Sequence, residues 1–184
     1  MTEVTYAGKD HCNTVLIGSG NPEEGELRPQ LLDRFGLSVE VKTPDTLAQR
    51  VEVVKRRDAF EQGPQAFTDA WKKEDDRVRR SIVAARKRLP DVAIPDQARE
   101  FAAQLCMSLG TDGLRGDLTL VRAARAEAAL QGASKVEQKH LIRVAPSALR
   151  HRLRRNPLDD SGSSTRVERA LAELTAPKPE SLNT

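Results

Sequence analysis

Asn21 is the first residue of the chain whose side chain and position suit contact with a phosphate group. It follows the apolar run at residues 14–17, which is predicted to be a short buried strand. Ligands of open α/β sheets bind beyond the carboxyl ends of the strands, where the Asn21 amide could hold a water molecule or a terminal phosphate. The alternative is that Asn21 only begins a turn with Pro22.

Arg34 carries a planar guanidinium group that is always charged, which suits it to a transferring phosphoryl group. An arginine that one subunit supplies to the phosphoryl-transfer site of another raises turnover roughly 10³- to 10⁵-fold. Asp33 directly precedes Arg34, so the alternative is an ion pair between these two residues at the end of a short helix. Spacing alone does not separate the two interpretations.

Arg115 lies in the first turn of a helix that is predicted to run to about Leu130. Gly113 allows the chain to turn sharply before it, and the N-terminal end of a helix favours anions. One side of this helix is apolar, so we expect it to be buried with Arg115 at its start. The alternative is that Arg115 pairs with Asp112 or Asp117.

The composition favours packed helices as the elements that position these residues. Aromatic residues make up 3% of the 184 residues and hydrophobic residues 38%, mostly Ala, Leu and Val. The formal charge of +3 is weak support for nucleic-acid binding. The basic run at residues 150–155 is predicted to be either a phosphate-binding patch or a solvated, arginine-rich helix end.

The cysteine and histidine residues form no metal-ligating pattern. Cys12 and Cys106 are far apart in the sequence, and the histidines are isolated from one another, so we expect no metal site. The same cysteine usage favours a reduced, cytoplasmic protein. No apolar run is long enough to span a membrane, and no signal peptide is evident.

Residues 1–43 contain too few strand candidates for an independent sheet. The two principal candidates are residues 14–17 and 37–41. We therefore expect them to form the edge of a larger parallel sheet.

The rest of the chain is predicted to be helical. Residues 44–92 form connecting helices, the first capped by Thr43 and ended by Gly63-Pro64. Residues 93–176 form a helical domain, in which Pro146 should kink or split a helix. Residues 177–184 form a disordered tail.

Two long stretches closely resemble one family of AAA+ ATPases, the ATPase subunit I of magnesium chelatase. Residues 18–41 contain Asn-Pro-Glu-Glu-Gly and Leu-Leu-Asp-Arg-Phe, and residues 109–126 contain Gly-Leu-Arg-Gly-Asp-Leu. The resemblance covers about residues 14–174. It implies the remnant of an α/β AAA+ core, at the edge of a parallel sheet, followed by a mainly α-helical lid domain, with the chain predominantly α overall.

The resemblance also implies roles for individual residues. Asn21 would be sensor 1 and Arg115 sensor 2, and both would contact the γ-phosphate of ATP. Arg34 would be an arginine finger that enters the neighbouring protomer's site. Asp33 would hold Arg34 in place or contact the neighbour, and Arg28 is a second candidate at that interface.

The function that the resemblance implies is that of an ATPase subunit, or a fragment of one, coupling ATP hydrolysis to Mg²⁺ insertion into protoporphyrin IX in chlorophyll and bacteriochlorophyll biosynthesis. Its partners would be other subunit I protomers in a ring, the D subunit and the porphyrin-binding H subunit, without nucleic acid. Two alternatives remain open. One is a non-catalytic docking or assembly piece of an AAA+ ring, and the other is a MoxR-type AAA+ remodelling ATPase.

The sequence lacks the phosphate-binding loop G-x-x-x-x-G-K-[ST]. The nearest approach, Gly8-Lys9-Asp10, lacks both the first glycine and the hydroxyl residue that would hold Mg²⁺. No apolar strand ends in Asp-Glu. We therefore expect that this chain alone does not hydrolyse ATP, and that ATP and Mg²⁺ are bound mainly by a nucleotide-binding half that it lacks.

Overall fold

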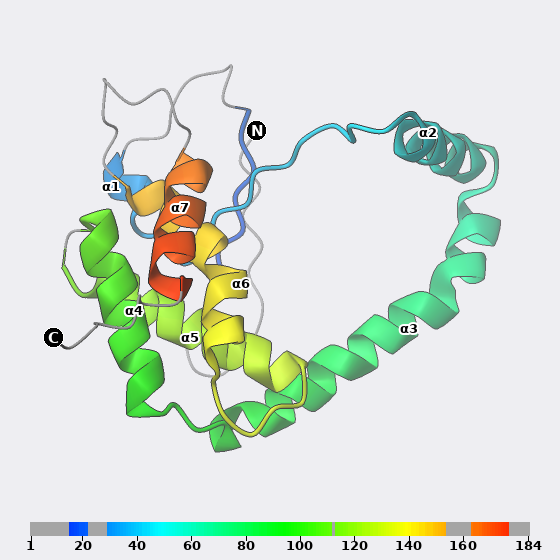
Figure 1. Cartoon of the computed structure of the whole chain (residues 1–184). Coiled ribbons are helices and arrows are strands. Elements are labelled where there is room, and N and C mark those ends of the chain that lie inside the picture. The colour runs from blue at the N-terminus through cyan, green and yellow to red at the C-terminus, as the bar shows by residue number, and fades with distance from the viewer. Residues whose placement is uncertain (1–14, 22–28, 112, 154–162, 177–184) are drawn as a thin grey trace, which may run out of the picture.

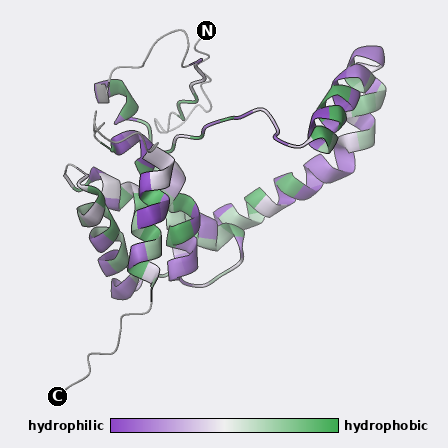
Figure 2. Ribbon diagram, turned by 45° about the horizontal axis from the view of Figure 1, so that its top comes forward, coloured by the Kyte–Doolittle hydropathy of each residue, from purple (hydrophilic) through white to green (hydrophobic). Residues whose placement is uncertain are grey.

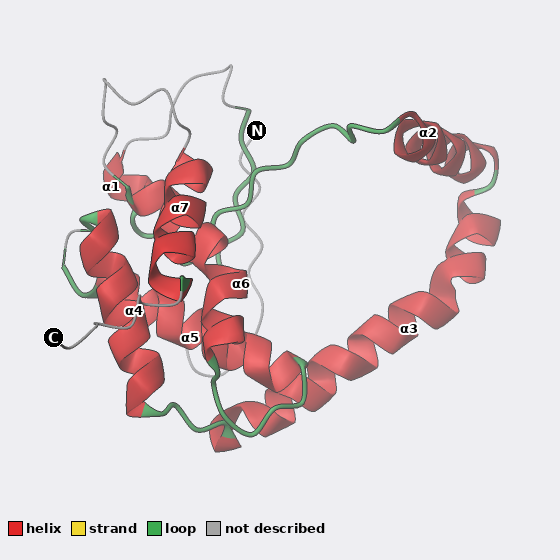
Figure 3. Cartoon of the chain, in the orientation of Figure 1, coloured by secondary structure: helices red, strands yellow, loops and turns green. Residues whose placement is uncertain are grey.

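The computed structural model describes residues 15–21, 29–111, 113–153 and 163–176. Regular secondary structure in these residues is entirely helical (Figure 3). Figure 1 shows a bundle of short helices from which two further helices project as an arm. In chain order the elements are α1 (Pro29–Leu32), α2 (Leu47–Gln62), α3 (Pro64–Arg88), η2 (Leu89–Asp91), α4 (Asp96–Leu109), α5 (Arg115–Leu130), α6 (Gln138–Leu149), η3 (Arg150–Arg152) and α7 (Ser163–Thr175).

The predicted sheet edge is not confirmed. Residues 15–17 and 37–41 have no regular secondary structure, and residue 14 lies outside the described residues. A strand is stable only when its backbone groups bond to a neighbouring strand, and the described part of the chain offers neither segment such a neighbour. The β-bridge found in that part joins Ala93 and Lys135, which lie in the helical half.

Helices α2 and α3 begin and end close to the positions that the sequence predicts. Thr46, rather than Thr43, caps α2, because its hydroxyl oxygen accepts a hydrogen bond from the Gln49 N–H at 3.3 Å. Gly63 separates the two helices, and Pro64 occupies the first position of α3. The start predicted at Thr43 is therefore three residues too early.

The two helices of the arm are joined through aromatic side chains. The ring of Phe67 lies edge-on to Phe60, with centroids 5.8 Å apart, and 6.0 Å from Trp71. The Arg56 guanidinium lies 4.6 Å from the centre of the Trp71 ring. Helix α2 has no buried residue, although Figure 2 shows that hydrophobic residues occur along the arm as well as in the bundle.

Helices α4, α5, α6 and α7 pack around one hydrophobic core, together with the end of α3. His140 is a fully buried polar residue within this core, and its Nδ1 accepts a hydrogen bond from the Glu137 N–H at 2.9 Å. Ser134 and Glu137 have the sequence spacing of a capping box, which predicts a helix start at Ser134, whereas α6 is capped three residues later, at Glu137. The largest fully buried side chains are Leu105, Leu120, Leu141, Leu149, His140 and Val167.

The sequence places Gly110 and Gly132 at the ends of two predicted helices, and the structure agrees. Gly110 directly follows α4 and Gly132 lies two residues after the end of α5, both with positive φ angles. Pro146 was expected to kink or split its helix, but α6 continues through it to Leu149. A proline removes only one backbone donor from the ladder, and burial of Ala145 and Ala148 holds this part of α6 against the core.

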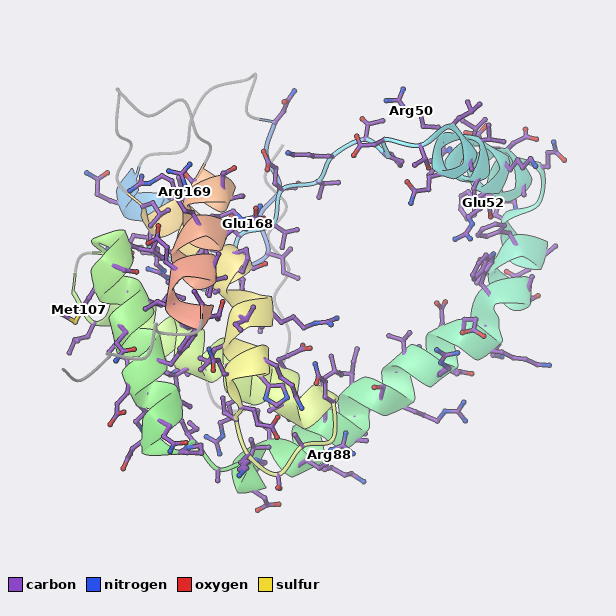
Figure 4. All side chains as sticks on the ribbon, in the orientation of Figure 1. Arg50, Glu52, Arg88, Met107, Glu168 and Arg169 are labelled. Carbon is purple, nitrogen blue, oxygen red and sulfur yellow. The ribbon has the colours of Figure 1, made fainter. Side chains whose placement is uncertain are left out.

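The arm is attached to the bundle where α3 ends. Arg88 donates two hydrogen bonds to the Ala129 carbonyl oxygen, at 3.1 and 2.9 Å, and Figure 4 shows Arg88 at this junction. Arg125 donates to the Pro90 carbonyl oxygen at 2.7 Å. Long-range bonds to backbone carbonyls therefore fix the last turn of α3 to α5.

Candidate functional site

Asp33, directly after α1, connects its segment to two arginines of the bundle. Its carboxylate forms ion pairs with Arg115, the first residue of α5, and with Arg152, the last residue of η3. The side chain of Arg115 is 59% exposed, whereas that of Arg152 is only 5% exposed. One carboxylate therefore joins a guanidinium that a ligand can reach to one that a ligand cannot reach.

Arg152 uses its guanidinium to bind backbone carbonyls as well as the carboxylate. Nη1 donates to the Asp33 carbonyl oxygen at 3.0 Å, and Nη2 donates to the Phe35 carbonyl oxygen at 2.8 Å. Nε donates to the Ala148 carbonyl oxygen at 3.2 Å, within its own helical turn. Thr119 of α5 lies at the edge of this network, with its hydroxyl oxygen 3.5 Å from Nη2.

His151 provides a second hydrogen bond to the same segment. Its Nε2 lies 3.0 Å from the Phe35 carbonyl oxygen, which can only accept, so Nε2 carries a proton and donates. Burial lowers the pKa of His151, and the positive charge of Arg152 acts in the same direction. The hydrogen bond to Phe35 and the charge of Asp33 oppose this shift without cancelling it.

Two further contacts continue the docking of this segment on α6. The Ser38 N–H donates to the Ser147 carbonyl oxygen at 2.8 Å. Arg150 lies 3.9 Å from a carboxylate oxygen of Glu40. The segment predicted as a strand at residues 37–41 is therefore bound to a helical end instead of a sheet.

Gly116 brings α5 close to α4 and so positions Arg115. It is buried, and a Cβ atom placed on it would lie 3.3 Å from Thr111 Oγ1 and 3.5 Å from Cys106 Sγ. A larger residue would push the first turn of α5 outward. The small size of Gly116 therefore fixes the position from which Arg115 reaches Asp33.

The structure describes four of the five predicted site residues, and Arg28 lies outside the described residues. Asp33 and Arg115 are in direct contact. Arg34 is exposed, and it forms no ion pair with Asp33, because the Asp33 carboxylate binds the two bundle arginines. Asn21 is also exposed, in a segment without regular secondary structure.

Arg152 and His151 were not predicted to take part in a site. The run at residues 150–155 was interpreted as a phosphate patch or a solvated helix end, and both interpretations are wrong for the buried Arg152. The available signal was spacing. Arg152 follows the buried residues Ala145 and Ala148 at helical intervals and so belongs to the same inward face.

The N-terminal end of α5 is suited to bind an anion. The described residues contain no group of three or more His, Cys, Asp or Glu side chains that could hold a metal ion. Arg115 is exposed at the N-terminal end of a 16-residue helix, which suits a phosphate group. None of the helices in this part of the chain is long and apolar enough to cross a membrane.

Comparison with known proteins first identifies the class. Residues 99–172 match the AAA lid domain family. The crystal structure of a Cytophaga hutchinsonii protein assigned as an ATPase matches 80% of this chain and 48% of its own length, with a TM-score of 0.58. Its sequence identity of 17% makes this a likeness of fold alone.

Sequence relatives then identify the particular protein that the chain resembles. It is 64% identical over 160 residues to the magnesium-chelatase 38 kDa subunit of Acidiphilium rubrum, covering 87% of this chain and 46% of that protein. It is 58% identical over 159 residues to the Rhodobacter capsulatus subunit of the same name, covering 86% and 45%. The chain spans about half the length of these curated relatives. The resemblance to magnesium chelatase subunit I is thus confirmed.

Proposed function

We propose that this chain supplies the lid and the adjoining part of the core to the ATPase subunit I of magnesium chelatase. The subunit would couple ATP hydrolysis to Mg²⁺ insertion into protoporphyrin IX. One observation carries the assignment: the exposed Arg115 at the start of α5 is paired with Asp33, the residue directly before the exposed Arg34. A triphosphate bound between protomers would take one such cation from each of them, Arg115 from its own protomer and Arg34 from the neighbour.

Each candidate residue has a role in this proposal. Arg115 contacts the γ-phosphate as sensor 2, and Asn21 does so as sensor 1. Arg34 enters the site of the neighbouring protomer, and Arg28 contributes to the same interface. Asp33 holds Arg115 in position through their ion pair until a phosphate group replaces the Asp33 carboxylate as the partner of the Arg115 guanidinium.

Mg²⁺ and the phosphate-binding loop belong to the part of the relatives that this chain does not match. What the described residues offer to a nucleotide is an exposed guanidinium group, that of Arg115. When bound, Mg²⁺ would neutralise charge on the phosphates. The residues of this chain would bind and orient the nucleotide.

The proposed layout has four parts. Residues 1–43 belong to the AAA+ core and would lie at the edge of its parallel sheet, residues 44–92 connect core and lid, residues 93–176 form the lid, and residues 177–184 are a tail. Other subunit I protomers in a ring, the D subunit and the porphyrin-binding H subunit are the proposed partners.

A chimaeric subunit tests the proposal. The part of the A. rubrum subunit that this chain does not match is joined to this chain, and the product is combined with the D and H subunits. We expect ATP hydrolysis and formation of magnesium protoporphyrin IX. Arg34→Ala should abolish hydrolysis while nucleotide binding remains.

Arg57→Ala is the matched control, because Arg57 lies exposed on α2 and pairs only with Glu61 in the described residues. It should leave both activities unchanged. Normal turnover by the Arg34→Ala chimaera would overturn the role of Arg34. An ATPase that never metallates the porphyrin would favour a remodelling ATPase, and altered turnover of the intact A. rubrum subunit on adding this chain would favour a docking piece.

A further inference from the structure

We propose that Arg152 is a positioning residue for Arg34. It fixes the backbone on both sides of Arg34, so that the Arg34 guanidinium is presented from one defined place to the nucleotide of a neighbouring protomer. This inference rests on the proposed function of Arg34 and assigns to the lid a part in building the site of the next protomer.

The inference rests on the way in which the Arg152 guanidinium binds the backbone on either side of Arg34. The two terminal nitrogens of Arg152 donate to the carbonyl oxygens of Asp33 and Phe35, at 3.0 and 2.8 Å, and Arg34 lies between them. A guanidinium is planar and rigid, so it fixes the distance between the two carbonyls that it binds. His151 donates to the Phe35 carbonyl oxygen as well, at 3.0 Å.

The amide groups of the same segment are also held. The Arg34 N–H donates to the Leu31 carbonyl oxygen and the Phe35 N–H to the Leu32 carbonyl oxygen, both at 3.0 Å. The backbone around Arg34 is thus bonded on its donor side to α1 and on its acceptor side to η3. The Arg34 side chain itself is exposed.

Burial excludes the simpler role of Arg152 as a phosphate ligand. Its side chain is 5% exposed, and its donors already bind Asp33, Phe35 and Ala148. A nucleotide could reach the exposed Arg115 but not Arg152. The effect of Arg152 on turnover must therefore pass through the residues that it holds.

The expected effect follows from the sensitivity of phosphoryl transfer to position. A misplacement of about 1 Å costs roughly 100-fold in rate. In the chimaeric subunit, we expect Arg152→Gln to lower kcat at least about 100-fold, because Gln cannot bind both carbonyls. The dissociation constant for ATP should stay unchanged, since Asn21 and Arg115, the residues proposed to contact the protomer's own nucleotide, are not substituted.

Mixed rings distinguish a misplaced finger from a general defect. An Arg152→Gln protomer is combined with a protomer that cannot bind ATP, made by substituting the lysine of the phosphate-binding loop in the A. rubrum part. The second protomer still offers a normal Arg34 to its neighbour. We expect the mixture to regain ATP hydrolysis that neither protomer shows alone, to the level that an Arg34→Ala protomer reaches in the same mixture.

Two further variants complete the design. Arg152→Lys keeps the charge but not the planar guanidinium, so it should behave like Arg152→Gln and be rescued in the same way. Arg143→Gln is the matched control, because Arg143 lies on α6 and its side chain is 71% exposed. Its turnover should equal that of the unsubstituted chimaera.

The outcomes separate this inference from the proposed function. Rescue of the Arg34→Ala and Arg152→Gln protomers alike supports both. Rescue of Arg34→Ala without rescue of either Arg152 variant, or full turnover by those variants alone, overturns the positioning role and leaves the proposed function standing. Normal turnover by Arg34→Ala alone overturns the proposed function, and the positioning role with it.

Discussion

Asp33 and Arg152 form an ion pair whose two ends differ sharply in exposure, since the Asp33 side chain is 47% exposed and that of Arg152 only 5%. The buried cation thus depends on an acid that remains half in solvent. Arg152 also has backbone carbonyls as partners, but these carry no full charge. Asp33 is therefore the residue whose loss would leave a buried charge without compensation.

The first prediction concerns Asp33→Ala, which we expect to lower the free energy of unfolding by about 2 kcal/mol. This is less than the full cost of an orphaned buried charge, because the carboxylate is half exposed and the carbonyls remain. Arg115→Ala removes the exposed half of the network and should cost about 0–1 kcal/mol. Urea unfolding of the chain measures both.

A double-mutant cycle provides the check on this assignment. Asp33→Ala combined with Arg152→Ala should cost clearly less than the sum of the two single changes, because the charges are lost together. Strict additivity would show that the two side chains do not stabilise each other.

The second prediction is a loss of stability on mild acidification caused by His151. Burial, reinforced by Arg152, lowers its folded-state pKa below the ordinary 6.5. The unfolded chain therefore binds more protons than the folded chain near and below pH 6.5, so the free energy of unfolding decreases as the pH is lowered through this window. The stability that neutral His151 contributes is complete above pH 6.5 and is lost as the pH falls through the lowered pKa.

His151→Gln is the variant for this measurement, because Gln can still donate to the Phe35 carbonyl oxygen but does not titrate. Denaturant unfolding between pH 7.5 and 5.5 should show a steeper fall for the unsubstituted chain than for the variant. The other histidines are the same in both proteins, so their contributions cancel in the comparison. Parallel curves would contradict the lowered pKa.

The helical half could be predicted from the sequence because its signals are local. Gly63-Pro64 and Gly110 mark helix boundaries that the structure confirms, since a glycine or proline acts on its own turn of backbone. The strand predicted at residues 37–41 could not be judged in this way. Its alternation is compatible with a sheet, but a strand also needs a partner, and sequence pattern does not say whether one lies beside it.

The position of Arg115 at the start of a helix was predictable because its signals are local. Gly113 lies two residues before it, and the apolar face of the helix follows it in the sequence. The contact of Asp33 with Arg152 joins residues 119 positions apart through a fold that no local pattern specifies. Arg152 is buried because it lies on the inward face of a helix end. The five basic residues of the run at 150–155 instead suggested that the whole segment is exposed.

The third prediction is that Cys106 resists alkylation in the folded chain. Burial raises its pKa to about 11, and the nearby charge of Asp117 acts in the same direction. The thiolate is the reactive form, so iodoacetamide at pH 8 should leave Cys106 unmodified while the chain is folded and modify it readily in urea. Peptide mass spectrometry measures the extent, and equal rates in both conditions would contradict the buried position.

The last prediction separates the arm from the bundle by means of Trp71, the single tryptophan of the chain. Phe67 lies between Phe60 and Trp71, so Phe67→Ala should expose the indole and shift its fluorescence to longer wavelength. The bundle core contains none of these rings, so its unfolding midpoint should stay unchanged. Phe101 packs next to that core, so Phe101→Ala should lower the free energy of unfolding of the bundle by about 2 kcal/mol and leave the emission wavelength of Trp71 unchanged. A lowered midpoint for Phe67→Ala would mean that arm and bundle unfold as one unit.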